Sequence, residues 1–162
     1  MSINYVIGDA TQPQGDGCKM ICHVVNDIGA FGAGFSGVLA RKWPQCERQY
    51  RYWSKTGSDD RFRLGEARGT AVELNITVCH MIAQRGVRSR AKPKPIDYDA
   101  LRSCLQQVKV YATVLDFSVH MPRIGCGLAG GTWLEVEAII QEELCAKGVS
   151  VTVYDLPAES SA

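Results

Sequence analysis

The stretch Pro122–Gly131, PRIGCGLAGG, decides how this sequence is interpreted, and Asn26–Gly37, NDIGAFGAGFSG, is its counterpart earlier in the chain. Each follows a run of apolar residues and precedes a helical pattern, so each is predicted to join a strand to a helix. Glycine permits positive φ angles and lets a ligand approach backbone amides without a Cβ atom in the way. A helix start adds unpaired N–H groups and a partial positive charge, which together bind anions. Two such turns at the carboxyl ends of strands predict a site for a diphosphate.

Neither glycine-rich turn matches a common nucleotide-binding motif. The chain has no G-x-x-x-x-G-K-[ST] sequence, which excludes a P-loop. Gly127-Leu-Ala-Gly130 lies far along the chain, without the strand–helix–strand unit and the acidic ribose partner of a dinucleotide-binding fold. The alternative is that the glycines serve only tight turns, and two turns of the same form in one small chain weaken that alternative.

Outward from these turns, apolar or β-rich runs alternate with helical patterns. Strands are predicted at Ile3–Gly8, Lys19–Val25, Ala67–Leu74, Ile76–Ala83, Ser118–Met121 and Val149–Tyr154. Asp97 is predicted to cap a helix over Tyr98–Leu115. Its apolar residues have helical spacing: Leu101, Cys104, Leu105, Val108, Ala112 and Leu115. Thr132 and Glu135 form a T-x-x-E capping box that predicts a further helix. This alternation is typical of an α/β fold, with helices layered on a largely parallel sheet.

Composition limits the classes of function. The 162 residues include 18 Lys and Arg against 17 Asp and Glu, for a net charge of +1. This balance argues against binding duplex nucleic acid, which favours a strongly basic face. No apolar stretch approaches the roughly 20 residues needed to cross a bilayer, and no signal peptide is recognised. We therefore expect one domain over residues 1–162, monomeric and cytoplasmic, with no membrane partner.

The seven cysteines are expected to be free thiols. None forms a C-x-x-C pair, and several, such as Cys22 and Cys79, lie within apolar runs. Buried thiols in a reducing compartment explain this pattern better than a zinc site or a disulfide framework. We expect no metal and no cofactor.

Four motifs, in order along the chain, resemble the macrodomain family, whose members bind ADP-ribose. They are Gly8-Asp9-Ala10-Thr11, then Val25-Asn26 followed by Gly32-Ala33-Gly34-Phe35, then Pro122–Gly131, and finally Val151-Thr-Val-Tyr154. Each motif alone is a weak signal, whereas the ordered set spans nearly the whole chain. The form of the two glycine-rich turns is similar to the branch with ADP-ribose-1''-phosphate phosphatases and the terminal ADP-ribose protein glycohydrolase.

The resemblance implies a three-layer α/β/α sandwich around a mixed six-stranded sheet. It implies that Asp9, with Ala10 beside it, binds the adenine amino group, and that Asn26 faces the distal ribose. The diphosphate and distal ribose would be wrapped by Gly32, Ala33, Gly34 and Phe35 on one side, and by Ile124, Gly125, Cys126, Gly127 and Leu128 on the other. Tyr154 is expected either to stack on the adenine or to be an ordinary core residue.

The chain departs from the terminal glycohydrolase at two positions. The family member has a lysine after the fourth strand and an aspartate after the G-x-G-L of the second turn, where this chain has Gln84 and Ala129. A covalent route through an amine nucleophile is therefore excluded. His23 and Asp27 are the candidate bases for activating a water, although His23 is equally suited to the core and Asp27 to a loop cap.

Two functions stay open. The first is an enzyme that hydrolyses a phosphate, acyl or protein linkage from the distal ribose of an ADP-ribose derivative, and this is the favoured one because the chain is a single domain. The second is a reader module that binds ADP-ribose or an ADP-ribosylated partner without turnover. The basic segment Arg85–Lys94 is interpreted as a solvated loop rather than a surface for RNA or poly-ADP-ribose, because it lacks aromatic residues for stacking.

Overall fold

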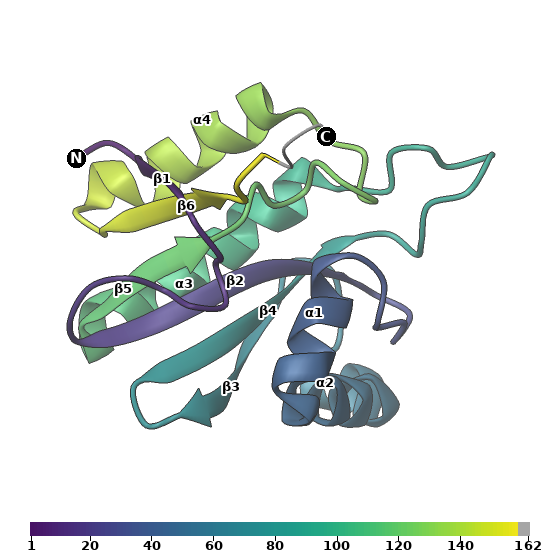
Figure 1. The fold of residues 1–162 in the computed structure, drawn as a ribbon. Helices are drawn as coiled ribbons and strands as arrows, with labels where there is room; N and C mark the ends of the chain where they lie inside the picture. The colour runs from purple at the N-terminus through teal and green to yellow at the C-terminus, as the bar shows by residue number, and fades with distance from the viewer. Residues whose placement is uncertain (159–162) are drawn as a thin grey trace.

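A computed structural model describes residues 1–158, in which six strands form one mixed sheet of order β1-β6-β5-β2-β4-β3 (Figure 1). Strand β3 runs antiparallel to β4, and the other neighbouring strands are parallel. The strand bounds are β1 Asn4–Ile7, β2 Cys18–Asn26, β3 Ala67–Glu73, β4 Ile76–Gln84, β5 Phe117–Met121 and β6 Val151–Asp155. The predicted strands are therefore all present, with ends that differ by one or two residues.

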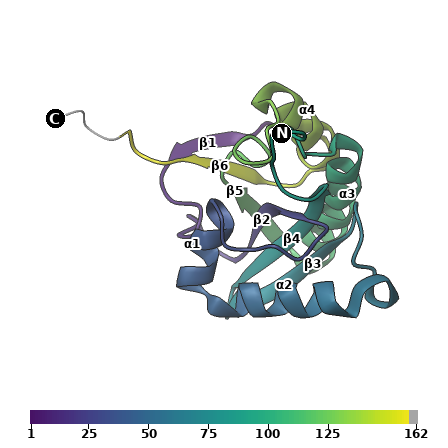
Figure 2. The ribbon, with the colours of Figure 1, turned by 90° about the vertical axis from the view of Figure 1, so that its right-hand side faces the viewer.

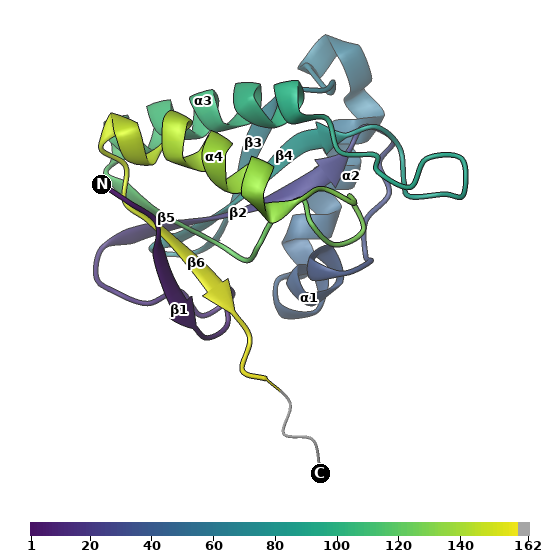
Figure 3. The same ribbon diagram turned by 90° about the horizontal axis from the view of Figure 1, so that it is seen from above.

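Helices cover both faces of the sheet, which confirms the predicted three-layer α/β/α sandwich. Helices α1 (Phe35–Lys42) and α2 (Pro44–Thr56) lie on one face, and α3 (Tyr98–Leu115) and α4 (Trp133–Glu143) lie on the other (Figures 2 and 3). Two short 3-10 turns follow α2 and α4, at Gly57–Asp60 and Cys145–Lys147. Within residues 1–158, none of the helices combines the length and the apolar character that crossing a bilayer requires.

The core is divided by the sheet. Between the sheet and α3 and α4, one large cluster buries the apolar stripe predicted for α3, from Leu101 to Ala112. Leu115 was assigned to that stripe but is 57% exposed, because it is the last residue of the helix before the left-handed Asp116. Under α1 and α2, smaller clusters surround Trp43 and Trp53.

The helix starts follow the sequence signals. The Asp97 carboxylate accepts a hydrogen bond from the Ala100 amide at 2.9 Å, as a helix cap does. Thr132 is also the N-terminal cap of its helix, but its hydroxyl donates to the Glu135 carboxylate at 3.1 Å. The reciprocal capping box does not form, because the Tyr98 hydroxyl already accepts the Thr132 amide at 3.1 Å.

Strand order brings the two glycine-rich turns together. Strands β2 and β5 are parallel neighbours, so their carboxyl ends lie at the same edge of the sheet. The first loop (residues 27–34) leads from β2 to α1, and the second loop (residues 122–132) leads from β5 to α4. Strand β4 pairs with the other side of β2, so the segment after Gln84 lies at this edge as well.

Candidate ligand-binding site

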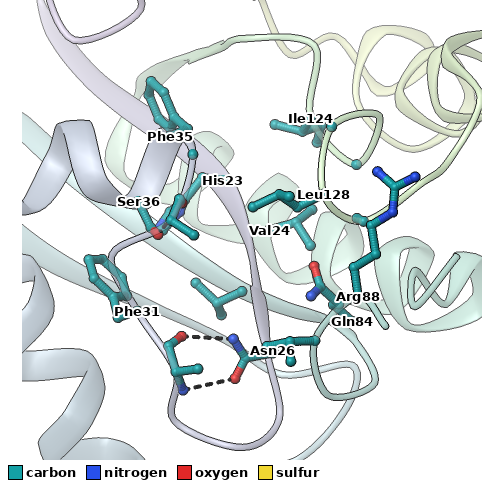
Figure 4. A pocket seen from close by; sticks show the side chains of 18 of the residues that line it. His23, Val24, Asn26, Phe31, Phe35, Ser36, Gln84, Arg88, Ile124 and Leu128 are labelled. Carbon is teal, nitrogen blue, oxygen red and sulfur yellow. Dashed lines mark hydrogen bonds between the residues drawn. The ribbon is translucent and has the colours of Figure 1, made fainter. Parts of the chain in front are cut away.

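A cavity of about 500 Å³ lies between the two loops, within the size range of small-molecule sites (Figure 4). Residues of the first loop and the start of α1 line one side, and residues of the second loop line the other. A Cβ atom added to Gly34 would lie 3.6 Å from Leu128 Cδ1, so the loops approach each other directly. The two turns therefore face the same space, as the sequence predicted.

The Asn26 side chain holds the first loop. Its Oδ1 accepts the amides of Ile28 and Ala30, both at 3.1 Å, and its Nδ2 donates to the Ala30 carbonyl at 2.7 Å. The Tyr50 hydroxyl of α2 has two acceptors on Asn26, the backbone carbonyl at 2.6 Å and Oδ1 at 2.9 Å. Asn26 lines the cavity and is 7% exposed, and these bonds use its Oδ1 and one of the two Nδ2 hydrogens.

Side chains from the helices hold the rest of the first loop. Arg51 of α2 donates to the carbonyls of Gly29 and Phe31 at 3.2 and 3.1 Å. Ser36, in the first turn of α1, accepts the Gly32 amide at 3.0 Å and donates to the Ala33 carbonyl at 2.7 Å. The first loop is thus shaped by the side chains beneath it.

The second loop is shaped by its own backbone. The Gly130 amide donates to the Gly127 carbonyl at 3.0 Å, and the Gly131 amide donates to the Gly125 carbonyl at 2.7 Å. A Cβ atom on Gly130 would lie 2.4 Å from the Pro93 carbonyl oxygen, and one on Gly131 would lie 2.6 Å from the Gly125 carbonyl oxygen. These two glycines are required by packing, whatever the ligand.

Gly127 differs from the other glycines of the second loop. It lines the cavity, and a Cβ atom added to it meets nothing within 4 Å. Within residues 1–158, no hydrogen bond of the chain uses the amides of Gly34, Phe35, Gly127 or Leu128. These four amides belong to residues that line the cavity, so both loops present N–H groups suited to an anion.

The charged residues of the cavity wall are basic. Arg88 and Arg123 line it, and none of the lining residues, all of them within residues 1–158, is an aspartate or a glutamate. Arg123 forms a bidentate ion pair with Asp155 at 2.7 and 2.9 Å, whereas Arg85 pairs with Asp97 at 3.0 Å outside the cavity. Arg88 is therefore the cation best placed to meet an anionic ligand (Figure 4).

Gln84 and Ala129 both line this cavity. The Gln84 side chain is 9% exposed and donates to the Gly86 carbonyl at 2.9 Å. The resemblance to the terminal glycohydrolase implied a lysine and an aspartate at these two positions. The cavity wall therefore contains neither an amine nucleophile nor a carboxylate at the places where that chemistry would need them.

The two candidate bases have different surroundings. His23 lines the cavity but is 2% exposed, and its Nε2 lies 2.7 Å from His80 Nδ1. Burial, and to a smaller extent the neighbouring His80, lower the pKa of His23 well below its usual value. Asp27 lies outside the cavity lining, and its Oδ1 accepts the Gly86 amide at 2.8 Å, which ties the first loop to the segment after β4.

Of the residues expected around adenine, Asp9 and Ala10 follow β1, and Tyr154 belongs to the neighbouring β6. Asp9 follows β1, and its Oδ1 accepts the Thr11 amide and hydroxyl, both at 2.8 Å, while Ala10 beside it is buried. Tyr154 is 3% exposed, and its hydroxyl bonds to the Gln14 amide and to His120, both at 2.8 Å, as in a core tyrosine. Neither Asp9 nor Tyr154 lines the cavity.

Two members of the loops, Gly32 and Cys126, are not among the residues that line the cavity. Gly32 has a φ of +123° with open space around its Cβ position, and Cys126 donates from its thiol to the Ile124 carbonyl at 3.3 Å. Burial raises the pKa of Cys126, which argues against a reactive thiolate. Five of the other six cysteines are buried and all seven are free, as expected.

The sequence did not identify Val87 and Arg88 as part of the cavity wall. Residues 85–94 were interpreted as a solvated loop, because their composition is polar and basic. The signal that places them here is the strand order, since the carboxyl end of β4 lies beside that of β2. Arg51 and Tyr50, which support the first loop, have no recognisable motif.

The fold and the cavity define an α/β protein in which two glycine-rich turns line one cavity at the carboxyl edge of the sheet. No known family model matches the chain. Bovine ADP-ribose glycohydrolase OARD1 is 31% identical over 158 residues, which covers 95% of this chain and 91% of the relative. The mouse chromodomain-helicase-DNA-binding protein 1-like is 29% identical over 96% of this chain, which spans only 18% of that relative's length.

Solved structures also include proteins similar to this chain. A macrodomain protein from Streptomyces coelicolor is 45% identical with a TM-score of 0.85, over 95% of this chain and 99% of that one. A protein from Bacteroides thetaiotaomicron is 48% identical with a TM-score of 0.91, over 96% and 99% of the two chains. Thermosipho africanus DarTG in complex with ADP-ribose, at 18% identity and a TM-score of 0.69 over 90% of this chain and 39% of that one, shares the fold. The chain belongs to the macrodomain family.

Proposed function

We propose that this protein binds ADP-ribose, with the diphosphate held between the first and second loops. The observation that carries the proposal is that both loops line one cavity and contain amides with no acceptor among residues 1–158. Such amides bind a diphosphate without a cluster of lysines, which suits a chain with a net charge of +1. The bovine relative is named an ADP-ribose glycohydrolase, and a protein with the same fold has been solved with ADP-ribose.

In this proposal the ligand lies along the carboxyl edge of the sheet. The diphosphate is next to Gly34 and Gly127, and the adenine extends past β6 toward Asp9. One Asp9 oxygen is occupied by Thr11, and the other is available to accept the adenine amino group. The distal ribose is near Asn26 and Phe35, with Arg88 at the rim. Tyr154 supports this edge from the core rather than stacking on the base.

Calorimetric titration with ADP-ribose tests the ligand assignment. We expect a micromolar or tighter Kd, which corresponds to about −8 kcal/mol or better. The variant Asp9→Asn keeps an oxygen for Thr11 but replaces the free acceptor oxygen by an amide NH2 group, which is a donor. It should bind ADP-ribose about tenfold more weakly, because a charged hydrogen bond is lost. The hypoxanthine analogue of ADP-ribose, which lacks the amino group, should not lose affinity in this variant. Equal losses for both ligands would remove Asp9 from adenine recognition.

A second candidate function is hydrolysis of a phosphate, acyl or protein linkage at the distal ribose. It is favoured by the bovine relative, a named glycohydrolase that the chain matches over 91% of that relative's length. Gln84 and Ala129 rule out a route through a lysine adduct, so the proposed reaction uses a water directly. For a phosphate or acyl ester, the water oxygen bonds to phosphorus or to the acyl carbon, the bond to the ribose oxygen breaks, and that oxygen takes a proton. For a glycosidic protein linkage, the water oxygen bonds to the ribose carbon and the protein group leaves with the proton. Asp27 retains one carboxylate oxygen not bonded to Gly86, and it is the candidate base.

Mass spectrometry of incubated substrates separates the enzyme from a reader module. ADP-ribose-1''-phosphate, O-acetyl-ADP-ribose and an ADP-ribosylated protein each give a distinct product if the substituent is removed. In an active protein, Asp27→Asn should slow turnover by about 10²-fold or more while ADP-ribose affinity is retained, because the amide keeps its acceptor for Gly86 but cannot take a proton. Binding without turnover of any of the three substrates would identify a reader.

A further inference from the structure

Three polar side chains form a chain of hydrogen bonds across the α1–α2 face of the sheet. His23 of β2 and His80 of β4 are direct neighbours in the sheet, and their Nε2 and Nδ1 atoms are 2.7 Å apart. His80 Nε2 lies 3.0 Å from the Thr70 hydroxyl of β3. All three residues are buried, and apolar Ile21, Val25, Val78 and Ile82 flank the histidines on the same strands. Buried polar groups in such surroundings are costly unless every hydrogen bond is made.

Each histidine carries a single proton at neutral pH. Burial lowers the pKa of His80 to about 3, and burial lowers that of His23 well below its usual value. A neutral imidazole has one donor nitrogen and one acceptor nitrogen. The proton positions of the two rings are therefore linked through the bond that they share.

The Thr70 hydroxyl decides which nitrogens carry the protons. Within residues 1–158 its only hydrogen-bond partner is His80 Nε2. A buried hydroxyl whose proton has no acceptor is unfavourable, so Thr70 donates and His80 Nε2 accepts. The His80 proton is then on Nδ1, which donates to His23 Nε2. The His23 proton must consequently be on Nδ1.

His23 Nδ1 opens onto the cavity between the two loops. It has no hydrogen-bond partner in the part of the chain that the structure describes, and that part has no fully enclosed side-chain nitrogen or oxygen lacking a partner. Since His23 is one of the lining residues, the uncommitted nitrogen faces the ligand space. Figure 4 shows the ring beside Phe35 and Ser36, and Phe31 and Phe35 pack edge-on against it with centroid distances of 5.8 and 6.1 Å.

We propose that Thr70 and His80 fix His23 as the Nδ1–H tautomer, so that His23 donates a hydrogen bond to a phosphate or ribose oxygen of the ligand. Thr70 and His80 are then positioning residues that act through His23. The ligand part of this inference rests on the proposed binding of ADP-ribose. It also gives His23 a role as a donor in place of the base that the sequence suggested.

The tautomers are measured directly by NMR of the imidazole nitrogens in ¹⁵N-labelled protein near pH 7. The chain has three histidines, so His120 serves as an internal reference. We expect both His23 and His80 to show a protonated Nδ1 and an unprotonated Nε2 without any ligand. A His23 protonated at Nε2 would overturn the proposal, whether or not the protein binds ADP-ribose.

Variants of Thr70 test the relay. Thr70→Val is isosteric and removes the hydroxyl proton, so the His23 Nδ1–H signal should weaken and ADP-ribose affinity should fall roughly three- to tenfold, as for loss of one neutral hydrogen bond. Thr70→Ser keeps the hydroxyl and should restore both readouts, and thermal unfolding verifies that each variant is folded. Unchanged nitrogen shifts and affinity in folded Thr70→Val would contradict the relay. If that variant does not fold, the wild-type and Thr70→Ser spectra still decide the tautomer. Absence of ADP-ribose binding by the wild-type protein would instead reject the proposed function.

Discussion

The two loops that enclose the cavity are built in opposite ways. The first loop takes its shape from side chains beneath it, chiefly Asn26, Ser36 and Arg51. The second loop takes its shape from bonds within its own backbone and from glycines, such as Gly130 and Gly131, that leave no room for a Cβ atom. Both nevertheless present amides to the same space.

This difference predicts where each loop is vulnerable. The first loop depends on residues outside it, including the buried His23–His80 pair against which Phe31 packs. The second loop rests on apolar residues, because Gly125 lies against Ile96 and Val136. Low pH and the removal of polar side chains should therefore destabilise the first loop more than the second. Added side-chain volume at a glycine should destabilise the second loop more than the first.

Acidification should have the largest effect. An unfolded histidine has a pKa near 6.5, whereas burial lowers the pKa of His80 to about 3 and that of His120 to about 4. The unfolded chain therefore binds more protons, and stability that is present above pH 6.5 is lost as the pH falls toward these folded values. The expected loss is about 1.4 kcal/mol per pH unit for each histidine. Urea unfolding between pH 7 and pH 5 measures it.

Hydrogen exchange over the same pH range compares the loops. The amides of residues 27–36 should lose protection before those of residues 124–131, because the histidine pair lies under the first loop. A free energy of unfolding that stays flat from pH 7 to pH 5 would show that the histidines are not buried as neutral groups.

Gly131→Ala should have the next largest effect. The added Cβ atom would lie 2.6 Å from the Gly125 carbonyl oxygen, which is backbone and cannot rotate away. We expect a loss of about 3 kcal/mol in the free energy of unfolding. Gly127→Ala is the matched control, because its Cβ atom meets nothing within 4 Å and should cost less than about 0.5 kcal/mol. Equal unfolding midpoints for the two variants would refute the assignment of Gly131 as a packing glycine.

Asn26→Ala should cost about 2 kcal/mol, because the Ala30 amide and carbonyl lose their partner in the first loop. It should also weaken ADP-ribose binding, since the loop amides are no longer held in place. Asn75→Ala is the control, because Asn75 is exposed and its side chain makes, within residues 1–158, a single 3.4 Å bond to the Gly17 carbonyl. An Asn26→Ala variant as stable as this control would mean that the conformation of the first loop does not depend on the Asn26 side chain.

Much of the fold was predictable because its signals are local. The Asp97 cap, the periodicity of α3 and the apolar strands depend on neighbouring residues alone. The convergence of the loops was also predictable, since both follow parallel strands whose carboxyl ends share one edge. The family resemblance, which rests on the order of the four motifs, also predicted the mixed six-stranded sheet.

The remaining features depend on contacts between distant segments. Gly127 and Gly130 are the same residue type in one turn, but only the path of Pro93 shows that Gly130 has no space for a side chain. Likewise, pairing of β2 with β4 is what joins His23 to His80. The sequence suggested Asn26 as a ligand contact, and the structure adds that its Oδ1 and one of its Nδ2 hydrogens hold the first loop.

The claim that backbone amides of the two loops hold a diphosphate is tested most directly by calorimetry on Gly127→Val. This change adds side-chain volume at a cavity-lining position where a Cβ atom meets nothing within 4 Å. The wild-type protein should bind ADP-ribose with a micromolar or tighter Kd, and the variant should unfold at the same urea concentration but show no detectable heat, a loss of about 100-fold or more. A folded Gly127→Val protein that binds ADP-ribose as tightly as the wild type would contradict the account.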